Sequence, residues 1–107
     1  MTDAPSLRAA LEAAAAALAD VERVADGGVI ELRRSGRAFA RLEIEGAAFR
    51  LDRVIAPAAL RTPDTSASPL GPEWVVFAPA VVDAFAVDRA SAWLEAAWRR
   101  AAPAARS

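Results

Sequence analysis

The chain contains no histidine, cysteine, lysine or tyrosine among its 107 residues. Without histidine there is no imidazole for acid–base catalysis, for a Ser-His-Asp triad or for a histidine metal site. Without cysteine there is no disulfide, no thiolate ligand and no thiol redox switch. The lack of lysine and tyrosine excludes Schiff-base chemistry, a P-loop phosphate clamp and catalysis by a phenol.

The charged side chains that remain are carboxylates and arginines. Thirteen basic residues, all of them arginine, stand against fourteen acidic residues and give a formal net charge of -1. This balance provides no overall field that would steer the chain to a polyanion or a membrane surface. Glu43 and Glu45 share one face of an expected strand, where simple alternation accounts for them. The composition favours a chain that is not an enzyme, and we expect no catalytic residue and no cofactor. A Mg²⁺ or Ca²⁺ site built from carboxylates such as Asp64 or Glu73 stays open, but no D-x-D-x-D-G pattern supports it, so we expect no metal site.

Length and composition indicate a single domain over residues 1–107, with an ordered core at about residues 6–102. Apolar residues make up 55% of the sequence, although many are alanines that bury little area each. Residues 1–5 lack the basic segment of a secretory signal. No apolar run approaches the roughly 20 residues that span a bilayer. The sequence predicts no membrane contact and a cytoplasmic location.

Hydrophobic spacing of three and four residues predicts a helix from Ser6 to about Val24, with the Ser6 hydroxyl as its N-cap. Alternating apolar and polar residues then predict three antiparallel strands, which cover 29–33, 38–45 and 47–52. The first two are joined by a hairpin connection at 34–37. In the second strand one face carries Ala38, Ala40, Leu42 and Ile44, and the other carries Phe39, Arg41, Glu43 and Glu45.

The chain beyond Arg53 loses this period. Residues 57–61 can form one helical turn that begins at a proline, and residues 62–72 have the composition of a loop. Residues 74–78 are rich in β-branched and aromatic side chains, which predicts a fourth strand inside the sheet. A final helix begins between Asp83 and Asp88 and ends at about Ala102.

The predicted fold class is therefore α+β. We expect an antiparallel sheet of about four strands with the N- and C-terminal helices packed on one face. The expected order is helix, three strands, irregular connector, strand, helix.

Three regions carry candidate binding residues. The 61–72 loop offers donors and acceptors for a small ligand, namely Arg61, Asp64, Thr65, Ser66 and Ser68, although loop chemistry accounts for the same residues. A basic hairpin gathers Arg33, Arg34, Arg37 and Arg41, which suits phosphate contact unless Glu31, Glu43 and Glu45 pair with them across the strands. Trp98 lies about 140° around the last helix from Trp93, at the rim of the core or on a partner surface.

The segment Glu73-Trp74-Val75-Val76-Phe77 and the following helix from Asp88 to Trp98 resemble two groups of small bacterial domains. One is the luciferase-domain family, and the other is the MmcQ/YjbR-like family. The second implies a two-helix, antiparallel-sheet fold and a suggested DNA-binding role, which the balanced charge of this chain does not favour. The first usually carries a mid-chain histidine that is missing here, so its activity is not carried over.

These observations favour a non-enzymatic binding or assembly domain. Its partner is expected to be a protein or a second copy of the chain, bound by the open sheet face or the Trp98 side of the last helix. The alternatives are a small ligand held at the 61–72 loop and, less favoured, nucleic acid bound by the basic hairpin.

Overall fold

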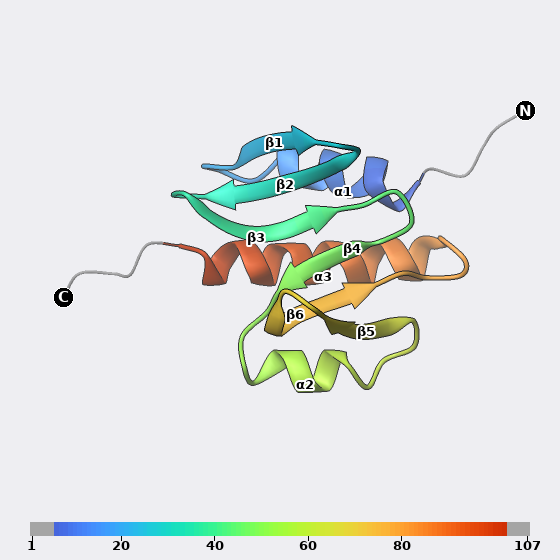
Figure 1. Cartoon of the computed structure of the whole chain (residues 1–107). Helices are drawn as coiled ribbons and strands as arrows, with labels where there is room; N and C mark the ends of the chain where they lie inside the picture. Colours follow the sequence, from blue (N-terminus) through green and yellow to red (C-terminus); the bar gives the residue numbers. More distant parts are fainter. Residues whose placement is uncertain (1–5, 103–107) are drawn as a thin grey trace, which may run out of the picture.

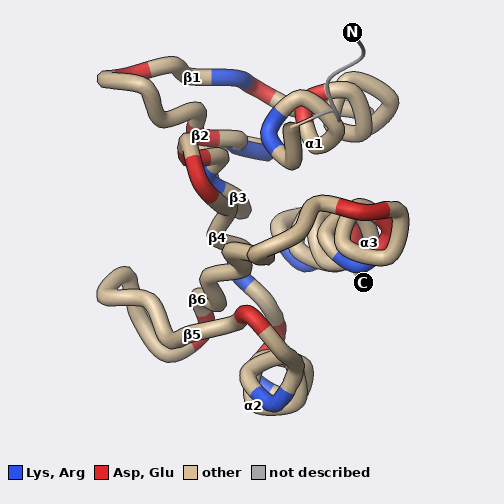
Figure 2. The backbone as a smooth tube through the Cα atoms, turned by 90° about the vertical axis from the view of Figure 1, so that its right-hand side faces the viewer, with Lys and Arg blue, Asp and Glu red and all other residues tan. Residues whose placement is uncertain are grey.

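A six-stranded antiparallel sheet forms the body of the computed structural model, which describes residues 6–102 (Figure 1). The strands are β1 (Glu22–Asp26), β2 (Val29–Arg34), β3 (Arg37–Leu42), β4 (Ala47–Arg50), β5 (Thr65–Ser68) and β6 (Gly71–Phe77), in the spatial order β1-β2-β3-β4-β6-β5. The helices are α1 (Leu7–Ala16), α2 (Ile55–Ala59) and α3 (Ala84–Arg100). Figure 2 shows α1 and α3 on the same side of the sheet.

The core lies between the sheet and these two longer helices. Alternate residues of four strands are buried against them, namely Ile30, Leu32, Ala40, Leu42, Ala47, Phe49, Val75 and Phe77. From α1 come Leu7 and Leu11, and α3 adds Leu94 and a row of alanines. The Trp93 ring of α3 packs against Phe49 and Phe77, with ring centroids 6.2 and 5.2 Å apart. Large aromatic groups thus fill the space that the alanines leave.

The structure confirms the α+β class, the antiparallel sheet and several element ends. The Ser6 hydroxyl caps α1 by accepting a hydrogen bond from the N–H of Ala9 at 3.0 Å. At the start of α3, the Asp83 carboxylate accepts one from the N–H of Ala86 at 2.8 Å. The predicted hairpin turns through Ser35 and Gly36, whose φ angles are 53° and 79°. Positive φ at both positions suits a tight two-residue turn.

The prediction for the first helix is wrong in its second half, which is not helical. α1 ends at Ala16, and Asp20 adopts a left-handed φ of 58° that redirects the chain into β1. All five residues of β1 are exposed, so no apolar alternation identifies this strand in the sequence. Leu18 and Val21 also continue the helical spacing, although their side chains pack against the core from outside the helix. Pairing with β2 makes this segment a strand.

The predicted loop over 62–72 is also corrected, because it contains the edge strand β5 and the start of β6. The sequence of β5 is Thr-Ser-Ala-Ser, which has no apolar face, and it is a strand because it pairs with β6. The short helix before it begins at Ile55, where the carbonyl of Asp52 accepts the N–H groups of Ile55 and Ala56 at 2.9 and 2.8 Å. The sheet therefore has six strands rather than about four.

Phe39 and Ile44 do not follow the alternation that the sequence predicts for the second strand. Phe39 is 0% exposed, whereas Ile44 is 80% exposed. A bulge sets Leu32 opposite Ala40 and Arg33 opposite Ala38, so Phe39 becomes the additional residue of β3. β3 ends at Leu42, which leaves Ile44 in the turn that follows. Among residues 6–102 no helix is long and apolar enough to cross a membrane.

Candidate functional site

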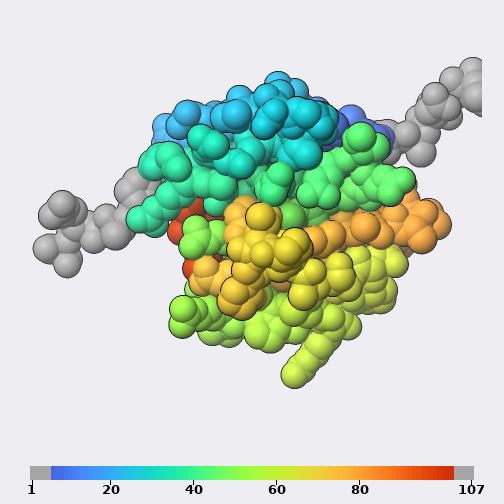
Figure 3. All heavy atoms as spheres, viewed as in Figure 1, coloured from blue at the N-terminus to red at the C-terminus, as the bar shows by residue number. Residues whose placement is uncertain are grey.

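The sheet splits at one end, between β3 and β4. The ladder joining them ends at the Ala40–Phe49 pair, although β3 pairs with β2 back to Arg37 and β4 pairs with β6 on to Arg50. The bulge at Phe39 lies at this point, and bulges bend the strand that carries them. A cavity of about 520 Å³ lies here. In Figure 3 the end of α3, in red, is seen between the β2–β3 hairpin and the chain after β4.

The residues around this cavity combine three arginines with small or buried apolar groups. They are Arg37, Ala38 and Phe39 of β3, Arg50 of β4, Arg100 of α3, and Ala97 and Ala101 at the end of α3. Because alanine side chains are short, the last turn of α3 leaves room beside the sheet. We call this region the arginine cleft. Its volume is within the range of about 300–1,000 Å³ that is usual for small-molecule sites.

Glu73 of β6 holds two of these guanidinium groups at one side of the arginine cleft. One carboxylate oxygen, Oε1, lies 3.3 Å from Nε of Arg50, and the other, Oε2, lies 2.5 Å from Nη2 of Arg100. A third arginine, Arg53, places its Nε 3.6 Å from the same Oε2. One carboxylate thus meets three guanidinium groups, so the positive charge is in excess.

Arg37 differs from these arginines because it forms no ion pair with any of residues 6–102. It is exposed at the start of β3 and lines the cleft together with Arg50 and Arg100. Its charge is therefore available to a ligand without the loss of an internal contact.

Burial of Glu73 would raise the pKa of its carboxyl group, but the surrounding arginines outweigh this effect. The charge of Arg100, the hydrogen bond from Arg50 and the charges of Arg50 and Arg53 together lower the pKa below its ordinary value. Glu73 is therefore ionised near neutral pH. It positions the arginines and does not act as a proton donor there.

The chemistry of the arginine cleft is that of anion binding. Guanidinium groups donate several hydrogen bonds in a fixed planar arrangement and match carboxylate and phosphate oxygens, often in pairs. The cavity-lining residues include no carboxylate, hydroxyl or other group that would exchange a proton near neutral pH. The arrangement can hold an anionic group, and it supplies no side chain for acid–base catalysis.

The structure separates the four arginines of the predicted basic hairpin. Arg33 pairs with Glu31 on its own strand at 2.5 Å, and Arg34 lies over the ring of Trp98. Arg37 lines the arginine cleft, while Arg41 has a buried Nε without a hydrogen-bond partner among residues 6–102. Ion pairing across the two strands, which the sequence suggests, is not formed in the described residues: Glu31 pairs along β2, and Glu43 and Glu45 pair with none of them.

Trp98 is half-buried and makes contacts inside the chain. Its indole N–H donates to the carbonyl of Ala19 at 2.8 Å, and the Arg34 guanidinium carbon lies 3.9 Å from the ring centroid. Arg34 also donates to the carbonyl of Trp98 at 2.9 Å. Trp98 thus ties α3 to the chain before β1 and to the β2–β3 hairpin. Its role as a partner surface stays a prediction.

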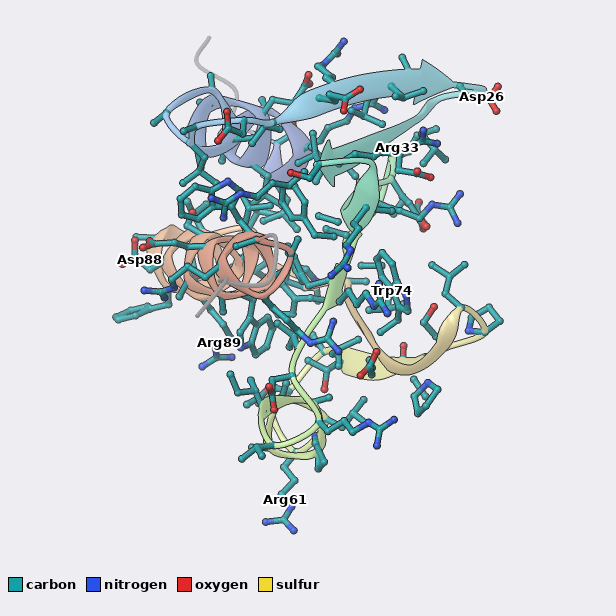
Figure 4. All side chains as sticks on the ribbon, turned by 90° about the vertical axis from the view of Figure 1, so that its left-hand side faces the viewer. Asp26, Arg33, Arg61, Trp74, Asp88 and Arg89 are labelled. Carbon is teal, nitrogen blue, oxygen red and sulfur yellow. The ribbon has the colours of Figure 1, made fainter. Side chains whose placement is uncertain are left out.

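The five candidates of the 61–72 loop lie along α2, β5 and the turn between them. Arg61 is exposed and extends away from α2 in Figure 4, and Ser66 is exposed on β5. The Thr65 hydroxyl donates to backbone carbonyls, and the Ser68 hydroxyl accepts the N–H of Leu70 at 3.1 Å. Asp64 lines a cavity of about 250 Å³ near the start of α3. The structure does not gather the five residues into one cavity that they line together, and ligand binding there stays a prediction.

Sequence reasoning found Arg37 but not its neighbours in the arginine cleft. Arg50, Glu73 and Arg100 come from β4, β6 and α3. No local motif links these residues. They come together because of the strand order and because α3 runs antiparallel to β6, which brings the end of the helix back to the start of that strand. The one local signal was Arg100 near the end of a helix, where the helix dipole also favours a cation.

Comparison with known protein families, with characterised proteins and with solved structures finds no match for this chain. The resemblance to the luciferase-domain and MmcQ/YjbR-like families therefore stays a prediction. The arginine cleft is the feature from which a function can be argued.

Proposed function

We propose that this chain is a non-enzymatic binding domain that holds an anionic group, a carboxylate or a phosphate, in the arginine cleft. One observation carries the proposal. Arg37, Arg50 and Arg100 line one cavity of about 520 Å³ whose lining includes no carboxylate. The nearby Glu73 carries one negative charge and contacts the guanidinium groups of Arg50, Arg53 and Arg100, so it neutralises only part of the positive charge.

The surroundings of the cleft also favour a bound anion. Ala97, Ala101 and Phe39 are nearly or fully buried, so the wall behind the guanidinium groups is apolar. Charge-assisted hydrogen bonds are stronger beside apolar groups than in open water, because there are fewer competing water molecules. Since Glu73 fixes Arg50 and Arg100, a ligand need not order these two long side chains, which reduces the entropic cost of binding.

Equilibrium titration with sodium phosphate and with succinate tests this function. Arg37→Gln removes a cleft guanidinium that has no internal ion pair, and Arg61→Gln removes an exposed guanidinium on the far side of α2. A charged hydrogen bond contributes about 1.5–3 kcal/mol, so Arg37→Gln should weaken binding about tenfold or more. Arg61→Gln should leave the affinity within about twofold, apart from a small effect of net charge.

Two results would contradict the proposal. One is that neither phosphate nor succinate binds the natural chain at low ionic strength. The other is that Arg37→Gln and Arg61→Gln weaken binding equally, since this would mean that the anions respond to net charge rather than to the cleft.

A further inference from the structure

A pair of carboxylates without ion-pair partners among residues 6–102 lies at the opposite end of β3 from the arginine cleft, and this points to an occupant for the cleft. The cleft lies where β3 begins, and the turn between β3 and β4 lies at the other end of the same strand (Figure 1). That turn carries Glu43, Ile44 and Glu45. Figure 2 is viewed from this end of the molecule and shows further acidic residues at the start of α3. We call residues 43–45 the acidic turn.

The acidic turn has charges without internal partners. Neither Glu43 nor Glu45 forms an ion pair with any of residues 6–102. Between them Ile44 is 80% exposed, which is among the most exposed large apolar side chains described. Two free carboxylates flanking an exposed aliphatic side chain form a surface that is both acidic and apolar.

The backbone holds the acidic turn in a fixed shape. The N–H of Glu43 donates to the carbonyl of Gly46 at 2.8 Å. Gly46 is buried, and a Cβ at this position would lie 2.7 Å from the carbonyl oxygen of Phe77. Because this close packing anchors the turn to β6, a partner would not have to order it, which lowers the cost of association.

We infer that the acidic turn of one copy docks in the arginine cleft of a second copy, so that the chains associate head to tail. This inference rests on the proposed function, because it uses the same cleft. The carboxylates of Glu43 and Glu45 meet the guanidinium groups of the cleft, Arg37 first among them. Because each copy has a formal net charge of only -1, the overall electrostatic repulsion between two copies is small.

Docking of this kind is heterologous, because each copy offers its acidic turn to one neighbour and its arginine cleft to another. Such contacts do not stop at a dimer but continue into open chains or rings. One turn in one cleft is a small contact compared with the about 1,200–2,000 Å² of stable complexes. Association should therefore be weak, favoured by high protein concentration and weakened by salt.

Two variants test the inference by sedimentation velocity over a concentration series at low ionic strength. The turn variant carries Glu43→Gln and Glu45→Gln, and the cleft variant carries Arg37→Glu. The natural chain should show an average mass that rises with concentration beyond that of a dimer. Each variant alone should associate at least about tenfold more weakly, because it lacks one of the two surfaces.

Mixing the two variants gives the most specific result. The turn variant keeps an intact cleft and the cleft variant keeps an intact acidic turn, so one such contact can form between them. The mixture should give a one-to-one complex that grows no further. A matched control with Asp20→Asn and Glu22→Gln changes the net charge as the turn variant does, at exposed sites away from the acidic turn, and it should associate like the natural chain.

The inference is overturned if the natural chain stays monomeric over the whole series, or if the turn variant associates as strongly as the control. Titration of the natural chain with phosphate, beside its sedimentation series, separates the two proposals. Phosphate binding without self-association would leave the proposed function in place and reject the docking alone. A natural chain that binds neither phosphate nor succinate would reject both.

Discussion

The carboxylate of Glu73 joins β6 to the last turn of α3, with 2.5 Å between its Oε2 and Nη2 of Arg100. Its second oxygen, Oε1, accepts from Nε of Arg50 at 3.3 Å. A single acidic side chain therefore sets the position of two of the three guanidinium groups in the arginine cleft. The third, on Arg37, is positioned by the β2–β3 hairpin alone.

Glu73→Gln should lower the free energy of unfolding near pH 7, because it leaves Arg50, Arg53 and Arg100 without their shared carboxylate. The pKa of Glu73 is lowered in the folded chain, so its stabilising effect is complete above the ordinary carboxyl pKa of 4.5. The effect is lost as the pH falls through the lower folded value. Urea denaturation at a series of pH values should show a difference in the free energy of unfolding between the natural chain and Glu73→Gln. This difference should disappear on acidification. Glu45→Gln is the control. If Glu73→Gln lowers the free energy of unfolding equally at acidic and neutral pH, the stabilising role of the Glu73 carboxylate is contradicted.

Filling the arginine cleft without a change of charge should also weaken anion binding. Ala38 is half-buried and lines the cleft, so Ala38→Leu adds volume where the ligand is expected. Phosphate affinity should fall at least about tenfold, since the loss of one charged hydrogen bond is enough for this. Ala58→Leu on the exposed side of α2 serves as the control. Unchanged phosphate affinity in a folded Ala38→Leu chain would place the anion elsewhere.

Trp98→Phe should destabilise the chain by about 1 kcal/mol, because the indole N–H to Ala19 is lost while an aromatic ring remains. Arg34 can still lie over the new ring, although phenylalanine binds a cation less strongly than tryptophan. Denaturation followed by circular dichroism measures the change without relying on tryptophan fluorescence. A stability equal to that of the natural chain would show that Trp98 does not tie α3 to the chain before β1.

Gly46→Ala should be costly because the new Cβ would meet the carbonyl oxygen of Phe77 at 2.7 Å and the Cβ of Ala78 at 3.1 Å. Overpacking of this kind typically costs about 1–3 kcal/mol. Gly27→Asn is the contrasting change: a Cβ there has no atom within 4 Å, and asparagine tolerates its φ of 59°. Thermal denaturation should rank the Gly46 variant well below the Gly27 variant. The reverse order would mean that the turn is not packed against β6 as described.

The sequence predicted those elements whose own residues carry a pattern. Leu7 and Leu11 mark α1, and the β-branched and aromatic run that ends at Phe77 marks β6. The edge strands β1 and β5 were not predicted, because one is exposed throughout and the other has no large apolar residue. Both are strands because a neighbour supplies hydrogen bonds, and that information is not local.

The candidate site was predictable only in part for the same reason. Arg37 stood out through its place in the basic hairpin. The bulge that buries Phe39 and parts β3 from β4 has no signature in the local sequence, where Phe39 simply continues the alternation. Without that separation there would be no cleft for Arg37 to share with Arg50 and Arg100.

The measurement that bears most directly on the arginine cleft is a phosphate titration of the isotope-labelled chain, followed residue by residue by NMR. The cleft predicts saturable shifts concentrated at the backbone amides of residues 37–39, Arg50 and 97–101. In Arg37→Gln these shifts should need at least about tenfold more phosphate to reach half-saturation, and in Arg61→Gln the midpoint should stay within about twofold. Shifts that are spread over the surface, or that saturate at the same phosphate concentration in Arg37→Gln, would contradict anion binding in the cleft.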